Sequence, residues 1–461
     1  MFAFKPLIYP ALLSLGATFP LASSAATAAT ASPSDMQQQM QQLVSHKAKA
    51  DQPGFTVIVR KGQQVLLRGG YGLADLEWST PMQPDSSLRL ASLTKQFTAL
   101  AVLQLVHAGK ITLQHKVGQV LPDYPAVGRE ISIHQLLSHS SGIPNLSRMP
   151  EFRDNKAKDA NLTQLLALFS RQPLQFQPGS RFSYSNSNYV LLTAIIEQVS
   201  QQSYADYLQQ HIFQPLGMKN SRYDSASAVI QQRARGYEQT PQGFRNADVI
   251  SMTRPQGAGG LISTVDDLNL WDQALYSEQL VPQPLLQQAF VKHPANNGQP
   301  QPYGYGWMMA DLAGFATQEH SGGIEGFSSY SIRIPDQQVY VAVLANSGSF
   351  DSYTLAIKLA AIAVGQPLEP DPITLSAATL AAITGNYQFD DGTERRITLE
   401  QGQLICQTKD GARQLLTPSR DGKLYLSDDI SYFKLGAIRH GKAELTLVIR
   451  GFGEFPATAV D

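Results

Sequence analysis

The 461-residue chain contains a single cysteine, Cys406, so no disulfide can form within it. Its 36 basic and 37 acidic side chains give a formal net charge of −1, which leaves no excess of positive charge for nucleic acid or an anionic membrane. A long uninterrupted apolar run is also lacking, because Pro10, Gly16 and Pro20 interrupt the N-terminal apolar segment 6–21. The near-zero net charge favours a small neutral or zwitterionic molecule, or a short peptide, as the partner.

The interrupted apolar run has the layout of a secretory signal peptide. It follows one cation, Lys5, and precedes small residues of the kind that signal peptidase accepts. We assign residues 1–28 to the signal, with cleavage within 25–31, because the run is too short and broken to span a membrane well. The protein is then exported, periplasmic or secreted, without stable membrane insertion; a retained anchor is the alternative.

The remaining chain is long enough for more than one compact unit. With 43% hydrophobic and 16% charged residues, we expect one large domain over residues 33–366 and an appendage. Periodicity predicts helices over 35–48, 93–106 and 353–364, strands over 55–59, 64–67, 327–334 and 339–344, and a mostly helical insertion over 110–260.

The C-terminal part differs in character. Residues 367–374 are rich in proline and predict a linker. In 375–461, Asp-Gly and Gln-Gly pairs separate short strand-like runs about every ten residues, which is typical of an all-β sandwich or small barrel. Cys406 is expected to be half-buried and structural there. Three roles are open for this unit: a lid over a cleft, self-association into a homo-oligomer, or stabilisation alone.

Ser92 and Lys95 form a Ser-x-x-Lys pattern at the start of a predicted helix. Apolar positions from Leu93 to Val106 recur at helical spacing and end before Gly109, so Ser92 lies at the N-terminal end of that helix. Residues three apart share a helix face, which brings the hydroxyl and the amine within reach of each other. A desolvated lysine can act as the base that activates a serine nucleophile. An ordinary amphipathic helix start would show the same pattern.

Two further polar segments fit the same chemistry. Tyr184 could relay a proton beside the lysine, and the amide of Asn186 could hold a substrate carbonyl and the lysine; a polar surface loop is the alternative. The stretch His320-Ser321-Gly322-Gly323 precedes a predicted strand pair whose edge could line a cleft. There Ser321 could donate to an extended substrate, and the Gly323 N–H could complete an oxyanion hole; a glycine turn into a hairpin is the alternative.

The order Ser-x-x-Lys, Tyr-x-Asn, then a small-residue triad resembles the three-motif signature of the serine β-lactamase and penicillin-binding protein (DD-peptidase) family. The resemblance covers about residues 37–366 and is strongest to the class C-like branch, peptidase family S12. It implies an α/β (α+β) fold: a β-lactamase/transpeptidase-like antiparallel sheet flanked by helices, with an all-α subdomain. The β-rich tail is similar to the lipocalin-like C-terminal domains of some members.

By this resemblance Ser92 is the nucleophile, Lys95 and Tyr184 are the acid/base pair, and Asn186 contacts both the substrate and the lysine. The N–H groups of Ser92 and Gly323 then form the oxyanion hole. The resemblance implies a serine hydrolase that forms an acyl-enzyme at Ser92 and hydrolyses amide or ester bonds, in small peptides containing D-amino acids or related compounds. Alternatives are a promiscuous carboxylesterase and a non-catalytic binding module that keeps the fold.

The chain departs from the family pattern at its third motif. His320-Ser321-Gly322 stands where penicillin-recognising members carry Lys-Thr-Gly, so a group mostly neutral near pH 7 replaces a permanent cation. The His-x-Gly form is similar to that of D-aminopeptidase-like and esterase-like relatives. The choice among D-peptides, esters and β-lactams is expected to depend on the loops 144–175 and 222–257.

Other candidate groups are assigned structural roles. A Gly-x-Ser-x-Gly elbow is absent from the sequence, and His139 is expected to be a structural turn residue. Glu325 is interpreted as a solvated turn acid, with binding of a substrate ammonium as the alternative. The aromatic segment 303–307 is interpreted as core packing, with a wall of the cleft as the alternative. The remaining histidines show no metal-ligand spacing, so we expect no metal and no cofactor: His46, His107, His115, His134, His211, His293 and His440.

Overall fold

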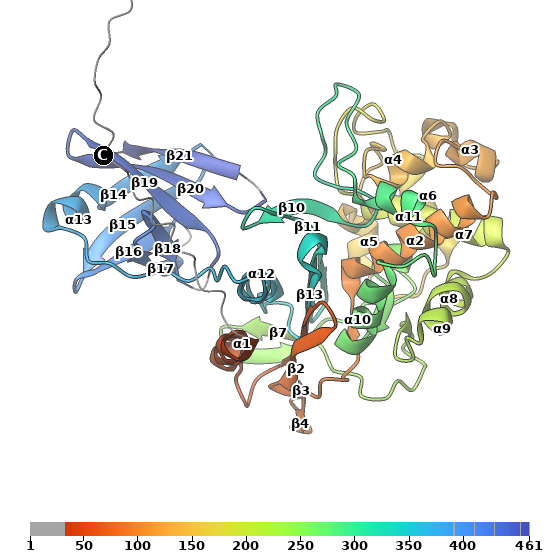
Figure 1. The fold of residues 1–461 in the computed structure, drawn as a ribbon. Helices are drawn as coiled ribbons and strands as arrows, with labels where there is room; N and C mark the ends of the chain where they lie inside the picture. The colour runs from red at the N-terminus through yellow and green to blue at the C-terminus, as the bar shows by residue number, and fades with distance from the viewer. Residues whose placement is uncertain (1–32, 391, 410, 428, 452, 461) are drawn as a thin grey trace, which may run out of the picture.

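The computed structural model describes residues 33–390, 392–409, 411–427, 429–451 and 453–460, and the predicted signal 1–28 lies outside the described residues. Its central layer is a six-stranded antiparallel sheet in the order β10-β11-β12-β13-β1-β2 (Figure 1). The strands are β1 (Phe55–Lys61), β2 (Gln64–Tyr71), β10 (Met308–Leu312), β11 (Phe315–Ile324), β12 (Phe327–Ile334) and β13 (Val339–Ala345). First and late strands of the large domain therefore share one sheet.

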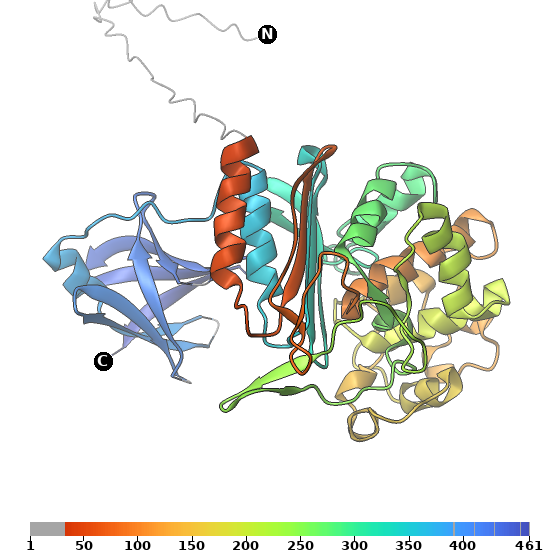
Figure 2. The same cartoon turned by 90° about the horizontal axis from the view of Figure 1, so that it is seen from below.

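Both faces of this sheet are covered, which explains the near-continuous apolar character of its inner strands. Val57 and Val59 of β1 pack on one face with α1 (Pro33–Lys47) and α12 (Ser352–Ala363), whereas Ile58 packs on the other face. Figure 2 shows α1 and α12 lying side by side on one face, with the helical region on the opposite face. The fold class implied by the three motifs is confirmed.

The helical region lies between the fifth and tenth strands of the chain. Its helices are α2 (Thr94–His107), α3 (Val117–Val120), α4 (Ile133–Leu137), α5 (Pro150–Asp154), α6 (Leu162–Phe169), α7 (Asn186–Ser200), α8 (Tyr204–Leu208), α9 (Gln214–Leu216), α10 (Val265–Ala274) and α11 (Gln283–Leu286). Short strands accompany them: β3 (Leu73–Asp75), β4 (Thr80–Pro81), β5 (Leu88–Arg89), β6 (Arg222–Tyr223), β7 (Tyr237–Thr240), β8 (Gly243–Asn246) and β9 (Leu261–Ser263).

The prediction of a mostly helical insertion over 110–260 is right up to α9 and wrong beyond it. Loops, β6 and the hairpin of β7 and β8 fill most of 217–260. The hairpin turn lies at Pro241-Gln242-Gly243, where Gly243 has φ 118°, a value that suits glycine. In the described part of the chain, no helix has the length and apolar character needed to cross a bilayer.

A buried charge cluster ties the sheet to the helical region. Asp272 of α10 is fully buried and binds Arg60 of β1, and its Oδ1 accepts from the Arg333 Nε of β12 at 2.7 Å. A buried carboxylate is tolerated only when it is paired and hydrogen-bonded, so the two arginines satisfy it. The cluster fixes α10 against two strands at once.

The C-terminal strands close into an eight-stranded barrel. Its strands are β14 (Gly385–Phe389), β15 (Glu394–Glu400), β16 (Gln403–Thr408), β17 (Arg413–Pro418), β18 (Lys423–Leu426), β19 (Tyr432–Arg439), β20 (Lys442–Ile449) and β21 (Gly453–Val460), preceded by α13 (Ala377–Ile383). Of the two predicted arrangements, the barrel is the one formed. Cys406 is buried rather than half-buried, because it alternates with Ile405 and faces the barrel core beside Leu404.

The barrel lies beyond α12 and the β10 strand, on the other side of the sheet from most of the helical region (Figures 1 and 2). Arg450, just after β20, binds Glu319 of β11 through two contacts of 2.9 Å and donates to the Asp311 carbonyl at 2.8 Å. Among the described residues, those that line the cavity beside Ser92 all fall within 91–325. The barrel is therefore not a lid over that cavity within one chain, and the lid hypothesis is wrong for this arrangement.

Candidate active site

Ser92 lies in a tight turn at the start of a buried helix. The 3₁₀ turn η1 (Ala91–Leu93) leads directly into α2, as the sequence predicts. Ala91 has φ 48°, a left-handed conformation that costs a non-glycine residue about 1 kcal/mol or more. Ala91 and Leu93 are buried on either side, whereas Ser92 is partly exposed. The strained turn therefore presents the Ser92 hydroxyl to the cavity.

Lys95 occupies the next turn and is fully buried. Its Nζ lies 3.0 Å from the Ser92 Oγ and donates to the Ala258 carbonyl oxygen at 2.7 Å. Within the described residues no carboxylate forms an ion pair with it, and burial holds the pKa of the Lys95 amine well below its usual value. The predicted pairing of Ser92 with Lys95 is present, with the lysine in surroundings that favour the neutral base.

Tyr184 comes from the loop before α7 and covers the lysine. The Lys95 Nζ lies 4.8 Å from the centroid of the Tyr184 ring. Burial raises the pKa of the Tyr184 phenol, and the neighbouring Ser92 hydroxyl offsets part of that rise. The phenol is therefore protonated near neutral pH and adjoins both Ser92 and Lys95, which suits it to donate a proton.

His139 holds the Tyr184 loop in place. It has φ 55° and is fully buried, so its interpretation as a turn residue is confirmed. Its ring lies 4.4 Å from that of Tyr184, and its Nδ1 accepts a hydrogen bond from the Ser185 N–H at 3.2 Å. Burial holds the pKa of His139 well below its ordinary value, so the ring stays neutral. His139 thus has a positioning role beside the site.

Asn186 begins α7 and borders the cavity. Its Nδ2 donates to the Ser147 Oγ at 2.9 Å, while its buried Oδ1 has no hydrogen-bond partner among the described residues. The predicted contact between Asn186 and Lys95 is not made, because the turn η5 (Gln256–Ala258) packs against both α2 and α7 and supplies the Ala258 carbonyl instead. The free Oδ1 is available to accept from a substrate N–H.

The third motif lies within a strand of its own. Residues His320 to Gly323 precede the predicted strand pair, which is β12 and β13, but they also form a strand themselves, β11, that pairs with β12. β10 pairs only with 315–319, so within the described parts of the chain this edge of β11 has no strand partner from His320 to Ile324. A Cβ added at Gly322 would come within 2.4 Å of the Leu90 carbonyl oxygen and 3.1 Å of the Ser92 nitrogen. The strand therefore passes directly against the turn that carries the serine.

Gly323 and Ser321 have more open surroundings than Gly322. A Cβ at Gly323 would meet no atom within 4 Å, and Gly323 lines the cavity. Ser321 is exposed on the same stretch of strand. An extended substrate can add to this free edge, with Gly323 opposite the Ser92 turn.

His320 is buried and held in one tautomer. Its Nδ1 donates to the Ser321 carbonyl oxygen at 2.6 Å, and its Nε2 accepts from the Tyr303 hydroxyl at 2.9 Å. Burial lowers the pKa of His320 to about 3. The expectation of a neutral group at this position is confirmed, and the motif supplies no cation.

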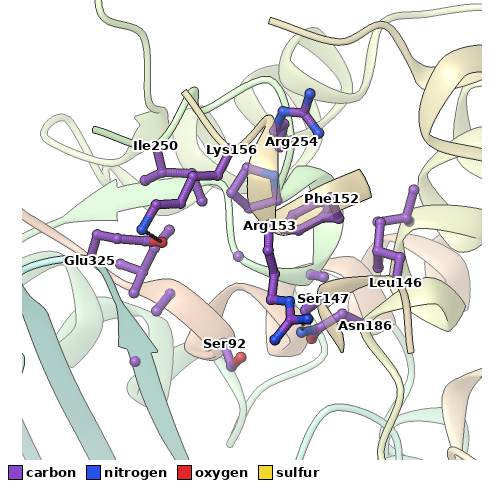
Figure 3. Close-up of a pocket in the computed structure, with 17 residues that line it drawn as sticks. Ser92, Leu146, Ser147, Phe152, Arg153, Lys156, Asn186, Ile250, Arg254 and Glu325 are labelled. Carbon is purple, nitrogen blue, oxygen red and sulfur yellow. Dashed lines mark hydrogen bonds and ion pairs between the residues drawn. The ribbon is translucent and has the colours of Figure 1, made fainter. Parts of the chain in front are cut away.

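A cavity of about 420 Å³ opens beside Ser92, and Figure 3 shows the side chains around it. It is lined by the turn of Ser92, by segments 146–156 and 250–259, and by 323–325 of β11. The two loops to which the sequence assigns substrate choice, 144–175 and 222–257, both contribute walls. Glu325 is not a solvated turn acid alone, because its Oε1 pairs with the Lys156 Nζ at 3.3 Å.

Several supporting groups were not predicted from the sequence. The Ala258 carbonyl that binds Lys95 precedes the pair Gly259-Gly260, and this pair was the local sequence signal for a turn there. Tyr303 packs in the core, as expected for the 303–307 segment, but its hydroxyl also orients His320. Arg153 also lines the cavity, and it belongs to none of the sequence motifs. In the described part of the chain, no three His, Cys, Asp or Glu side chains gather in a group that could hold a metal ion.

Comparison with known protein families identifies the family to which the chain belongs. The family model described as Beta-lactamase matches residues 36–364. Penicillin-binding protein 4* of Bacillus subtilis is 30% identical over 395 residues, 80% of this chain and 87% of that protein. The chain belongs to the beta-lactamase family and is a serine hydrolase.

Two further relatives have more specific names. The D-aminopeptidase of Gluconobacter oxydans is 30% identical over 358 residues, 75% of this chain and 65% of that protein, so the chain spans just under two thirds of that relative's length. The octameric penicillin-binding protein homologue from Pyrococcus abyssi superimposes with a TM-score of 0.63 at 24% identity, over 92% of this chain and 99% of that one. This likeness shows the fold, with a coverage that includes most of the C-terminal barrel.

Proposed function

We propose that this chain hydrolyses amide bonds in small peptides or amides containing D-amino acids, through an acyl-enzyme on Ser92. The observation that carries the proposal is the 3.0 Å contact between the Ser92 Oγ and the Nζ of Lys95, a buried lysine without a carboxylate partner in the described residues. The names of the D-aminopeptidase and penicillin-binding protein relatives support the substrate class.

In the first step the neutral Lys95 amine takes the proton of the Ser92 hydroxyl as Oγ attacks the substrate carbonyl carbon. The resulting oxyanion is bound by the N–H of Ser92 and the N–H of Gly323, two residues that both line the cavity. Preorganised donors of this kind are worth about 3 kcal/mol each in the transition state. The Asn186 Oδ1 accepts from an amide N–H of the substrate.

Collapse of the tetrahedral species breaks the bond to the leaving amine. Tyr184 donates its phenolic proton to that amine and regains one from Lys95, whose Nζ lies beneath its ring. A water then attacks the acyl-enzyme and gives a proton to the same pair; the bond between the carbonyl carbon and Oγ breaks, and the pair returns that proton to Oγ, which releases the acid and free Ser92. The buried, neutral His320 keeps its two hydrogen bonds throughout and orients β11.

The intact mass of the purified protein tests the nucleophile. Incubation with a reactive fluorophosphonate should add one phosphonyl group to the wild type and none to Ser92→Ala, whereas Ser277→Ala, at an exposed serine, should be labelled like the wild type. A parallel incubation with benzylpenicillin reports whether a neutral His320 permits acylation by a β-lactam. A fluorophosphonate adduct that persists in Ser92→Ala would overturn the proposed nucleophile.

The substrate class is tested with the p-nitroanilides of N-acetyl-D-alanine and N-acetyl-L-alanine and with p-nitrophenyl acetate. We expect turnover of the D-anilide over the L-anilide, lost in Ser92→Ala. Ester turnover without either anilide would favour a carboxylesterase, and folded protein without adduct or turnover would favour a binding module.

We also propose that residues 1–28 direct export and that the protein self-associates. Support for export is the signal-like N-terminus, and support for self-association is the octameric homologue from Pyrococcus abyssi, whose coverage extends over most of the barrel. N-terminal sequencing of secreted protein should find a start within 26–32. Light scattering on the wild type should give a mass above that of one chain, and a monomer would refute self-association.

A further inference from the structure

The cavity beside Ser92 holds more positive than negative side chains. Arg153, Lys156 and Arg254 line it, against the single carboxylate of Glu325. Each of the three cations has different surroundings, and these decide which one is free to meet a ligand.

Lys156 is already neutralised by protein groups. Its Nζ lies 3.3 Å from the Glu325 Oε1 and 3.1 Å from the Asp248 Oδ2. Figure 3 shows Lys156 and Glu325 meeting at one side of the cavity. The ion pair closes that side of the cavity. Glu325 is the carboxylate among the described lining residues that could bind a substrate ammonium, and it is already paired with Lys156.

Arg254 is committed to the wall. It is 6% exposed, its Nε donates to the Lys158 carbonyl oxygen at 2.7 Å, and its guanidinium lies 5.5 Å from the centroid of the Phe152 ring. In Figure 3 its guanidinium points away from Ser92. Arg254 therefore stiffens the cavity without facing the nucleophile.

Arg153 is different from both. It is an exposed residue of α5, and Figure 3 shows its guanidinium reaching toward Ser147 and Asn186, on the side of the cavity nearest Ser92. Among the described residues no carboxylate forms an ion pair with it. A guanidinium that faces a reactive serine without a counter-charge is a ready site for an anionic group, which it can bind through two parallel hydrogen bonds.

The position of the cavity indicates which half of the substrate it receives. Tyr184, which donates to the leaving amine in the proposed function, does not line the cavity, whereas Asn186 and Gly323 do. The leaving group must face the phenol, so the cavity takes the acyl half. Resting on that function, we propose that Arg153 determines specificity by binding a carboxylate on the acyl half of the substrate.

The test uses two boronic acids that differ in one group, 3-carboxyphenylboronic acid and 3-carbamoylphenylboronic acid. The Ser92 Oγ bonds to boron, which becomes tetrahedral, and the serine proton passes to Lys95, so that no group leaves. The aryl ring then projects into the acyl side. Inhibition constants are measured by competition against fluorophosphonate labelling of Ser92.

We expect the wild type to bind the carboxylate at least about tenfold more tightly than the carboxamide. The preference should disappear in Arg153→Gln, return in part in Arg153→Lys, and shrink as salt is raised. The matched control is Arg148→Gln, an exposed arginine five residues earlier that does not line the cavity, which should keep the wild-type ratio. Binding of the neutral carboxamide should be similar in all of these variants.

Two outcomes would overturn the assignment. Equal binding of both boronates by the wild type, or a preference that survives in Arg153→Gln, would exclude Arg153 as the anion-binding group while leaving the proposed function intact. Failure of both boronates together with absence of Ser92-dependent labelling would instead overturn the proposed function, and the specificity assignment with it.

Discussion

The contact between Arg450 and Glu319 makes a specific prediction about how the barrel is held. Their side chains are 12% and 7% exposed, and the guanidinium binds the carboxylate through two contacts of 2.9 Å. Although burial lowers the pKa of Arg450, the hydrogen bonds and charge of Glu319 outweigh it and raise that pKa above its ordinary value. The pair joins the barrel to β11, next to His320.

The perturbation is Arg450→Met, which keeps most of the aliphatic stem and removes the charge. Glu319 is then left nearly buried without its cationic partner, and its neighbours are the hydroxyls of Thr317, 3.0 Å away, and Tyr330. Breaking a buried ion pair by removal of one partner costs about 3–5 kcal/mol, and the residual exposure of Arg450 places the expected loss near about 3 kcal/mol. The variant Glu319→Gln should lose less, because a neutral amide is cheaper to bury.

The assay is a double-mutant cycle in which unfolding in urea is monitored by tryptophan fluorescence. Proteolysis of the segment 367–374 is measured in parallel, so that release of the barrel is distinguished from unfolding of the large domain. We expect the double variant to be more stable than the sum of the two single losses by about 1–3 kcal/mol. Arg439→Met is the matched control, since its pair with Glu444 is 72% and 53% exposed and should contribute less than about 1 kcal/mol.

Simple additivity in this cycle would refute the reasoning, because it would mean that neither side chain depends on the other. The reasoning would also be refuted if Arg450→Met lowered the free energy of unfolding by no more than Arg439→Met does. In either case the barrel would be held by other contacts.

Three further predictions follow from buried charged or titratable groups. Asp272→Asn should lower the free energy of unfolding by about 3–5 kcal/mol, measured in urea, because Arg60 and Arg333 lose their shared carboxylate. Burial lowers the pKa of His320 to about 3, so below about pH 6.5 the unfolded chain binds a proton there that the folded chain does not. A change from pH 7 to pH 5 should therefore lower the free energy of unfolding by about 2 kcal/mol through this group. In His320→Asn this part of the pH dependence should be absent. Lys95→Arg should lower kcat/KM by about 10³-fold or more, because arginine does not lose its proton. In the wild type, kcat/KM should rise with pH and reach its plateau well below the ordinary lysine pKa, because the deprotonated Lys95 amine is the base. Activity retained in Lys95→Arg would exclude that role.

Local sequence carried much of the fold. The 3.6-residue period after Ser92 and the turn pairs of the C-terminal part predicted α2 and the all-β tail, because periodicity and turn chemistry act over a few residues. The same local reasoning failed where partners lie far apart in the chain. Cys406 was expected to be half-buried, and only closure of the barrel places it in a core.

By itself the sequence determined the chemical class, because the spacing of Ser92 and Lys95 on one helix turn needs no distant contact to bring a hydroxyl to an amine. The tertiary structure decided what that chemistry can act on. Burial beneath Tyr184 makes the lysine a base. Segments that are distant in the chain meet around the cavity, where Arg153 lines the wall and Glu325 is paired with Lys156. Solvent exclusion and charge pairing between remote segments depend on packing, which no short pattern of residues contains.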